Sequence, residues 1–198
     1  MKKFLALLML VGMILTLGQG AVSAQGKILV AYFSRVGEEY GVGNITKGNT
    51  AIIAEIIARQ TGGDLFEIKT VTPYPSNYDE CTKIASREKA ANARPELSTA
   101  VKNFAQYDTI FIGSPIWWGN APMAIYSFLE SYDFSGKTIV PFVTHGGSGL
   151  SGLDQRFALA CPNSKILQGF EIRGTTARND TAQAESRISS WLKKIGLI

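Results

Sequence analysis

Two adjacent tryptophans, Trp117 and Trp118, are the first candidates for ligand contact in this sequence. They stand in the stretch GSPIWWGNAPM, between Pro115 and Gly119. Because successive side chains of a strand point to opposite faces, two adjacent indoles cannot both fill one core. Indole rings also stack on flat π systems, which adds about 0.5–1.5 kcal/mol to the burial of their area. The stretch is therefore expected either to hold a flat ligand or to plug the end of a sheet.

A second stretch, TKGNTAIIAEI, carries residue types that bind phosphate. Ser34 begins the loop before it, and Asn49 and Thr50 stand where a helix is expected to begin. Short hydroxyl and amide side chains can donate to a phosphate there, together with the free N–H groups of the first helical turn. Gly48 permits close backbone approach, and Arg35 would add positive charge. The alternative is that Asn49 or Thr50 only caps the helix.

A third stretch, THGGSG, places glycines around the only histidine of the chain, His145. Glycines let a backbone approach a ligand closely, and they stand here at 146, 147 and 149. A lone histidine is often only a satisfied structural residue, but a position at the end of a strand favours a functional one.

Ser148 in the same stretch raises the alternative of a serine hydrolase. The G-x-S-x-G nucleophile motif requires glycine at position 150, and Leu150 stands there. The only available base, His145, lies three residues away in the same loop, which is poor geometry for a catalytic triad. A hydrolase is therefore the less favoured hypothesis.

The elements that position these stretches follow from the hydrophobic pattern. Nearly continuous apolar runs, rich in β-formers, indicate strands that are buried on both faces. Apolar residues at helical spacing separate them. Strands are expected at 27–34, 64–70, 107–114, 137–144 and about 166–170, and helices at 49–63, 77–93, 121–132, about 150–160 and 181–196.

This alternation of strands and helices is typical of a doubly wound α/β sheet, with helices on both faces. Ligands of such sheets bind beyond the carboxyl ends of the strands, where the strand order reverses. The three stretches described above follow the first, third and fourth strands. They are therefore expected to meet at one edge of the sheet and to form one site.

Together, ILVAYFS, the Ser…Gly-Asn-Thr loop, YDTIFIGSPIWWGNAPM and KTIVPFVTHGGSG resemble the flavodoxin family, from about Lys27 to the C-terminal helix. The resemblance implies a five-stranded parallel sheet in the order 2-1-3-4-5 and non-covalently bound FMN. The implied phosphate-binding residues are Ser34, Arg35, Gly48, Asn49 and Thr50. Those implied beside the flavin ring are Pro115, Ile116, Trp117, Trp118, Gly119, Thr144, His145, Gly146, Gly147, Ser148 and Gly149.

The sequence departs from the family pattern in two respects. About a dozen residues, 36–47, separate Arg35 from Gly48, where the phosphate loop of the family is compact. This insert is expected to fold over the flavin edge or to extend toward a partner, and Tyr40 would reach the ring. Carrier flavodoxins are also strongly acidic, whereas this chain has a net charge of +4.

The N-terminus reads as a secretory signal peptide over residues 1–24, followed by a flavodoxin-like domain over 25–198. Lys2 and Lys3 precede an apolar run, and Val22-Ser23-Ala24 has the form of a cleavage site. The run is short for a membrane span, so no span is expected after cleavage. Loss of the two lysines leaves 18 basic and 16 acidic residues, without a basic cluster suited to nucleic acid. The protein is expected to be exported, to a periplasm or to the exterior.

Cys81 and Cys161 are the only cysteines. Export would permit a disulfide, but both lie in ordinary structural stretches, so two separate thiols are favoured. One histidine and two distant cysteines offer no metal-ligand cluster.

The favoured function is an FMN-dependent redox protein, in which the flavin does the chemistry and the chain orients it. It would transfer single electrons or oxidise a reduced nicotinamide and reduce a quinone-like acceptor, with a protein or a small molecule as its redox partner. Trp118 is expected against the flavin, Trp117 as the anchor of its loop, and His145 at the pyrimidine edge. The alternative is a binding module that keeps the fold without the flavin.

Overall fold

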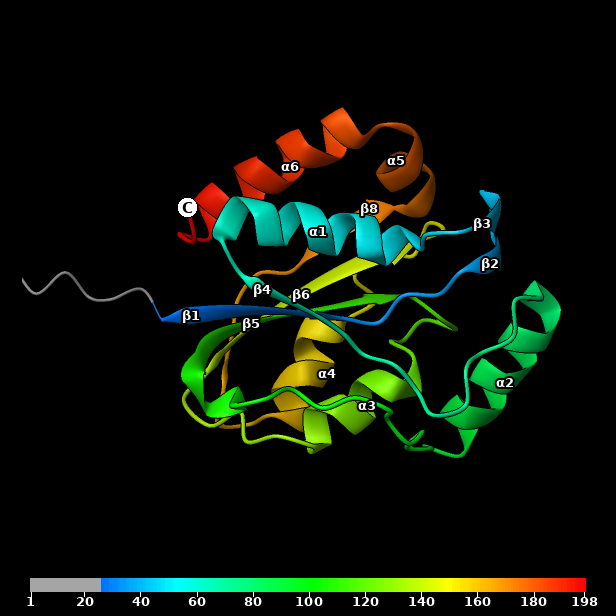
Figure 1. Cartoon of the computed structure of the whole chain (residues 1–198), viewed down its shortest axis with the longest axis horizontal. Helices are drawn as coiled ribbons and strands as arrows, with labels where there is room; N and C mark the ends of the chain where they lie inside the picture. The colour runs from blue at the N-terminus through cyan, green and yellow to red at the C-terminus, as the bar shows by residue number, and fades with distance from the viewer. Residues whose placement is uncertain (1–25) are drawn as a thin grey trace, which may run out of the picture.

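A parallel sheet forms the centre of the computed structural model, which describes residues 26–198 (Figure 1). Its order is β4-β1-β5-β6, with β7 and β8 both beside β6. The strands are β1 (Lys27–Tyr32), β4 (Asp64–Glu67), β5 (Tyr107–Pro115), β6 (Thr138–His145), β7 (Lys165–Ile166) and β8 (Phe170–Arg173). This confirms the order 2-1-3-4-5, with the fifth strand in two pieces. The predicted signal peptide lies outside the described residues.

The three central strands form because their side chains are apolar on both faces. Val30, Ile110 and Val140 have no exposed surface, and each lies in a run of β-branched or aromatic residues. Burial of such a side chain stabilises the fold by about 1.5–3 kcal/mol. Polar side chains appear where these strands end, at Tyr32, Ser114 and His145, so the sheet has one edge that is suited to a ligand site.

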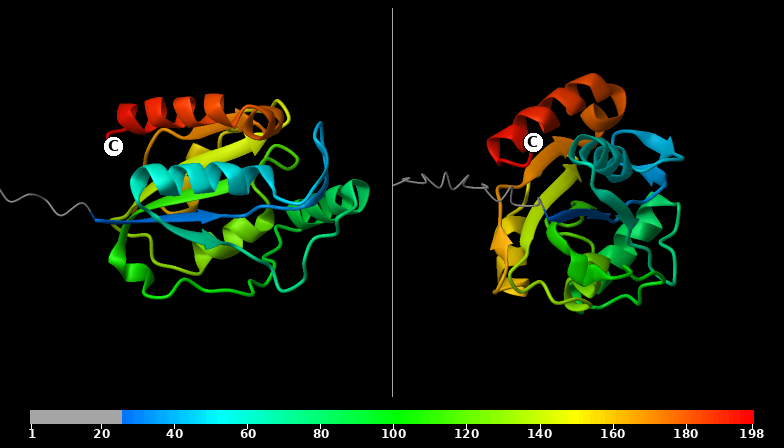
Figure 2. Two further views of the ribbon diagram at one scale, coloured as in Figure 1. Left: turned by 45° about the horizontal axis from the view of Figure 1, so that its top comes forward. Right: turned by 60° about the vertical axis from the view of Figure 1, so that its left-hand side comes forward.

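Helices cover both faces of the sheet, as predicted (Figure 2). One face carries α1 (Asn49–Thr61), α5 (Gly174–Asn179) and α6 (Thr181–Lys194), whose apolar side chains pack with Val30, Phe111 and Val140. The other face carries α3 (Met123–Glu130) and α4 (Leu153–Ala160), which pack with Ile110 and Val143. A 3₁₀ turn, η1 (Phe104–Gln106), leads into β5.

The remaining elements lie beyond the carboxyl ends of the strands. Helix α2 (Tyr78–Ala90) contacts α3 and strand β2 instead of a face of the sheet (Figure 1). Strand β2 (Gly37–Glu39) pairs antiparallel with β3 (Gly43–Ile45). The insert at 36–47 therefore contains a short hairpin that stands beside α2.

The break in the fifth strand has a local cause in its neighbour β6. Thr138 and Ile139 pair with β7, and Phe142–His145 pair with β8, so the gap lies opposite Val140 and Pro141. Proline has no N–H group to donate to a ladder. The hydrophobic pattern predicts neither this gap nor the six-residue α5, which is too short to show a clear helical period.

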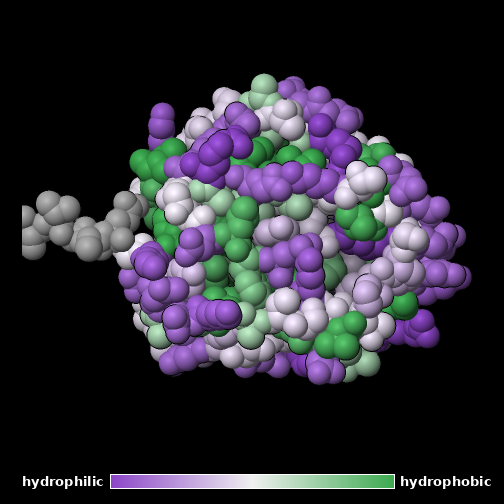
Figure 3. Space-filling view, viewed as in Figure 1, coloured by the Kyte–Doolittle hydropathy of each residue, from purple (hydrophilic) through white to green (hydrophobic). Residues whose placement is uncertain are grey.

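Both cysteines are buried free thiols, which confirms the favoured interpretation and excludes a bridge between them in this structure. Burial raises the pKa of each thiol to about 11. Hydrophilic residues cover most of the face in Figure 3, and hydrophobic ones form small separate groups on it. Within residues 26–198, no helix has the length and apolar character needed to cross a membrane.

Candidate functional site

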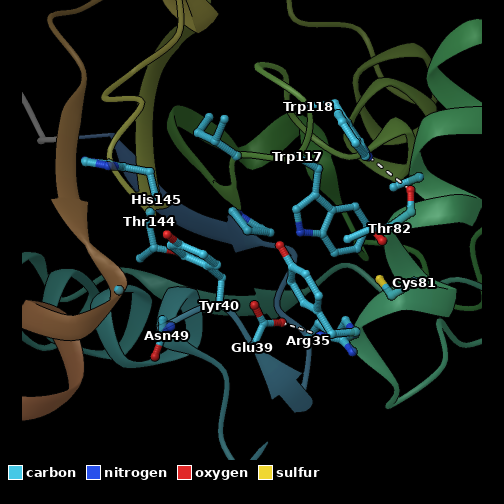
Figure 4. A pocket seen from close by; sticks show the side chains of 16 residues that line it. Arg35, Glu39, Tyr40, Asn49, Cys81, Thr82, Trp117, Trp118, Thr144 and His145 are labelled. Carbon is cyan, nitrogen blue, oxygen red and sulfur yellow. Dashed lines mark hydrogen bonds and ion pairs between the residues drawn. The ribbon is translucent and has the colours of Figure 1, made fainter. Parts of the chain in front are cut away.

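The three predicted stretches meet at the carboxyl edge of the sheet, around a cavity of about 230 Å³ (Figure 4). We call it the sheet-end cavity. Nine of the sixteen predicted site residues line it: Arg35, Asn49, Pro115, Ile116, Trp117, Trp118, Thr144, His145 and Gly146. The prediction that these loops form one site in space therefore agrees with the fold; their contact with a cofactor stays a prediction.

The other seven predicted residues, Ser34, Gly48, Thr50, Gly119, Gly147, Ser148 and Gly149, do not line the cavity. Two of them, Ser34 and Gly48, fix the position of the start of α1 next to the cavity. The Ser34 Oγ atom accepts a hydrogen bond from the Ala51 N–H group at 3.1 Å and so fixes the start of α1. A Cβ atom on Gly48 would stand 2.0 Å from that Oγ atom, so this approach requires glycine. Ser148 is exposed.

The start of α1 has donors suited to an anion. Gly48 precedes the helix without a side-chain cap, and within residues 26–198 no acceptor is bonded to the N–H groups of Asn49 and Thr50. Arg178 adds positive charge, because its guanidinium donates to the Asn49 Oδ1 atom at 3.1 Å and to the Lys47 carbonyl. Free N–H groups and a nearby cation favour a bound phosphate.

Arg35 has a structural role that the sequence did not reveal. Its side chain is only 5% exposed. The guanidinium donates to the carbonyls of Pro75, Glu38 and Ser76 at 2.6–3.0 Å and to the Glu39 carboxylate at 2.6 Å. Arg35 therefore fixes the hairpin to the segment before α2. Burial raises the pKa of Glu39, against the opposing effect of this bond.

The two tryptophans have different surroundings. Trp117 packs edge-on against Phe33 at 5.4 Å and Tyr74 at 5.0 Å between ring centroids, whereas Trp118 is 58% exposed. The indole N–H group of Trp118 donates to the Thr82 carbonyl at 3.0 Å. The expectation that Trp117 anchors the loop agrees with these contacts, and the expected stacking of Trp118 on a flavin stays a prediction.

The loop itself turns tightly at Trp118. The N–H and carbonyl groups of Trp117 and Asn120 bond to each other at 2.8 and 3.0 Å. Between them, Trp118 and Gly119 have φ angles of 52° and 71°. The left-handed region suits glycine but is rarely adopted by a bulky residue, and such strain concentrates at functional sites. The Thr82 contact holds the exposed indole at the mouth of the cavity despite this strain.

The hairpin places Tyr40, which is 70% exposed, at the rim of the cavity. Figure 4 shows Tyr40 and Trp117 projecting into the cavity from opposite walls. A Cβ atom on Gly146 would lie 3.0 Å from the Tyr40 ring, so the ring already contacts that glycine. The tip of the hairpin approaches α5, because a Cβ atom on Gly41 would lie 3.6 Å from Thr175. The insert thus borders the cavity, and its expected contact with the edge of a flavin stays a prediction.

His145 is 8% exposed and pairs with Glu171 of β8, and in Figure 4 its side chain points away from the centre of the cavity. Its Nε2 atom pairs with the Glu171 carboxylate, and within the described chain its buried Nδ1 atom has no partner. Since its hydrogen bond is to Glu171, His145 does not activate Ser148 in this structure. Burial alone would raise the pKa of Glu171, but the bond and charge of His145, and then Arg187, bring it below the ordinary value.

Residues of α2, α5 and the hairpin that the sequence did not indicate complete the cavity: Tyr78, Cys81, Thr82, Ala85, Gly174 and Glu39. Tyr40, which the sequence did indicate, also lines it. An amphipathic pattern does not tell whether the buried face of a helix contacts a core or a cavity. Gly174 had a usable signal, because it follows the fifth strand at the edge where ligands bind.

A family model described as flavodoxin matches residues 27–194. The chain belongs to the flavodoxin family. This confirms the resemblance found in the sequence and supports FMN as the cofactor. Among curated proteins, none is similar to this flavodoxin-family chain. Within its described residues, no group of three or more histidine, cysteine or acidic side chains is placed to hold a metal ion.

Solved structures resemble this flavodoxin-family protein over most of its length. A protein of Bacteroides eggerthii assigned as a flavoprotein is 34% identical with a TM-score of 0.70, over 86% of this chain and 98% of that one. A second, from Bacteroides uniformis, is 32% identical with a TM-score of 0.68, over 85% and 98%. A flavoprotein of Lactobacillus acidophilus in complex with FMN shares the fold at 22% identity and a TM-score of 0.60, over 79% and 99%.

Proposed function

We propose that this flavodoxin-family protein is an FMN-dependent redox protein that works after export. The observation that carries the proposal is the sheet-end cavity, where a free helix start, aromatic walls and a glycine-rich loop come together. When bound, FMN would supply hydride or single-electron transfer, while the chain binds and orients it. The relative from Lactobacillus acidophilus, which shares the fold, is in complex with FMN.

The residues present fit the chemical groups of FMN. The N–H groups of Asn49 and Thr50, with Arg178 beside them, would hold the phosphate. Trp117, Trp118 and Tyr40 would contact the flat ring. Charge-assisted hydrogen bonds at the phosphate would contribute about 1.5–3 kcal/mol each.

The tight turn at Trp118 and Gly119 would place a backbone group beside the redox-active edge of the ring. Two successive left-handed residues turn the peptide between them, so its orientation is set by the turn. A hydrogen bond from this turn would tune the redox potential. His145, at the end of β6, would stand at the pyrimidine edge and stabilise added negative charge.

The redox partner is proposed to be a protein or a small electron donor or acceptor. Two reactions are compatible with the site: one-electron transfer to a protein, and oxidation of a reduced nicotinamide followed by quinone reduction. The exposed aromatic rim around the cavity, Tyr40, Tyr78 and Trp118, is suited to a flat small molecule or to the apolar centre of a protein contact.

Purification of the exported chain tests this proposal. Yellow protein with flavin absorbance, which releases FMN on heating, is the expected result. Steady-state turnover with NADH or NADPH and a quinone would then identify a reductase, and reduction without such turnover would identify a carrier. A colourless protein that also fails to bind added FMN would refute the proposal and favour a flavin-free binding module.

A further inference from the structure

We propose that helix α2 holds Trp118 in position at the mouth of the sheet-end cavity, and that Lys89 is the positioning residue for this contact. Trp118 lines the cavity, whereas Lys89 does not. The inference rests on the proposed function in one respect, because Trp118 is taken to contact the bound FMN. Loss of Lys89 should therefore weaken FMN binding although Lys89 does not touch the cofactor.

The first step is the backbone conformation of Trp118. Its φ angle of 52° and that of 71° at Gly119 belong to the left-handed region. The reciprocal hydrogen bonds between Trp117 and Asn120 make these two residues the centre of a two-residue turn. Such a turn, with positive φ at both central residues, favours asparagine, aspartate or glycine in the first central position. Tryptophan is unfavourable there, so contacts outside the turn are needed to keep its conformation.

Two hydrogen bonds join Trp118 to α2, one at its side chain and one at its backbone. The indole Nε1–H group donates to the Thr82 carbonyl at 3.0 Å, as the dashed line in Figure 4 shows. The Lys89 Nζ atom donates to the Trp118 carbonyl at 2.5 Å. Among the described residues, these are the only hydrogen bonds of Trp118. The first bond fixes the direction of the indole, and the second fixes the peptide that follows it in the turn.

Both contacts come from one side of α2. Thr82 and Lys89 are seven residues apart, which is about two helical turns and places them on the same side of the helix. Cys81 and Ala85 of the same helix are buried, at 3% and 7% exposure. Helix α2 is therefore anchored by its buried residues and gives Trp118 a fixed support.

The expected effect on ligand binding is preorganisation of the indole. Trp118 is 58% exposed, so without these contacts its side chain would be free to change direction before binding. Fixing a side chain before the ligand arrives removes the entropy cost of ordering it in the complex. Lys89→Met removes the bond to the Trp118 carbonyl and keeps an unbranched side chain of similar helix propensity. We expect FMN affinity about fivefold lower in this variant, which corresponds to about 1 kcal/mol.

The test compares the wild-type chain with Lys89→Met, Lys89→Arg and the matched control Lys83→Met. Lys83 is an exposed lysine of the same helix, and its side chain has no hydrogen bond or ion pair within residues 26–198. Titration of the flavin-stripped proteins with FMN should show the loss of affinity in Lys89→Met and wild-type affinity in Lys83→Met. Lys89→Arg can still donate to the carbonyl and should retain most of the affinity. Urea unfolding of all variants should stay close to that of the wild type, because both lysines are exposed.

A second readout needs no cofactor. The chain has three tryptophans, so ¹⁵N-labelled tryptophan gives three indole N–H signals, and Trp118→Phe identifies that of Trp118 by its loss. In the flavin-free protein, Lys89→Met should shift the Trp118 signal and speed its exchange with solvent. The Trp191 indole, which donates to the Gln168 carbonyl at 2.9 Å, is the internal reference and should keep its signal. Lys83→Met should leave both signals unchanged.

The two readouts separate the inference from the proposed function. If the wild type binds no FMN, the proposed function fails, and the indole signal still decides whether Lys89 positions Trp118. If FMN binds equally well to the wild type and Lys89→Met, or equally weakly to Lys89→Met and Lys83→Met, the inference is overturned and the proposed function stands. An unchanged Trp118 signal in Lys89→Met would also overturn it.

Discussion

The side-chain hydroxyls of Thr50 and Thr144 lie 2.8 Å apart and join the first turn of α1 to the end of β6. Both side chains are buried, at 2% and 4% exposure. These threonines belong to two predicted cofactor stretches that are 94 residues apart in sequence. The contact therefore fixes the distance between the start of α1, with its free N–H groups, and the loop that contains His145.

Loss of one of these hydroxyls should remove the hydrogen bond between α1 and β6 and lower the stability. Thr50→Val or Thr144→Val leaves the other hydroxyl buried without this partner, and each should lower the free energy of unfolding by about 1–2 kcal/mol. The double variant removes both polar groups, so its loss should be smaller than the sum of the single losses. Urea unfolding of the four proteins measures the coupling, and additive losses would contradict the contact.

Arg35 should be essential to the hairpin. Arg35→Met leaves the Glu39 carboxylate and three carbonyls without their donor in a buried place. A loss of about 3–5 kcal/mol is expected from breaking a buried pair. The control is Lys47→Met in the same insert, which breaks an exposed pair with Glu55 of α1 and should cost at most about 1 kcal/mol. Equal losses in thermal or urea unfolding would show that the Arg35 network does not hold the fold.

Trp117→Ala should mainly reduce stability, whereas Trp118→Ala should mainly reduce FMN affinity. Trp117 packs on Phe33 and Tyr74, so its removal should cost about 3 kcal/mol of stability. Trp118 is largely exposed, so its removal should change stability by about 0.5 kcal/mol and should mainly weaken FMN binding. Urea unfolding of both variants measures the loss of stability, and titration with FMN measures the loss of affinity. Similar losses of stability and of FMN affinity in both variants would show that the two tryptophans have the same role in the core.

Both cysteines are buried free thiols, so their rates of alkylation can be compared to detect a ligand in the cavity. With their pKa values raised from 9 to about 11, both thiols should react with iodoacetamide roughly a hundredfold more slowly than an ordinary thiol at pH 8, and faster as the pH rises. Cys81 lines the sheet-end cavity and Cys161 does not. Added FMN should therefore slow the alkylation of Cys81 severalfold and leave Cys161 unchanged, as measured by peptide mass spectrometry. Equal protection of both thiols would contradict a ligand in this cavity.

The parallel sheet and its order were predictable from particular residues. Val30, Ile110 and Val140 each lie in a separate run that is apolar on both faces. Such runs indicate strands of a sheet that has helices on both sides. Gly48, Trp117 and His145 follow such strands, and the carboxyl-edge rule brings them to one place. Long periodic elements were therefore predicted well.

Contacts between segments that are distant in the chain could not be predicted from the sequence. The hydrogen bonds of Arg35 run to carbonyls of Pro75 and Ser76, and backbone carbonyls have no sequence signature. The partner of His145 is Glu171, 26 residues away on the fifth strand, and the break of that strand opposite Pro141 of β6 has no signal in the sequence. Thr82 and Ala85 line the cavity only because α2 stands at the end of the sheet instead of on its face.

Flavin titration of the flavin-stripped chain tests the central claim most directly. FMN and riboflavin differ only in the phosphate, which the start of α1 and Arg178 are proposed to hold. We predict one FMN per chain, with riboflavin bound at least about tenfold more weakly, which corresponds to about 1.4 kcal/mol for the phosphate. A folded chain that binds neither flavin would contradict the account.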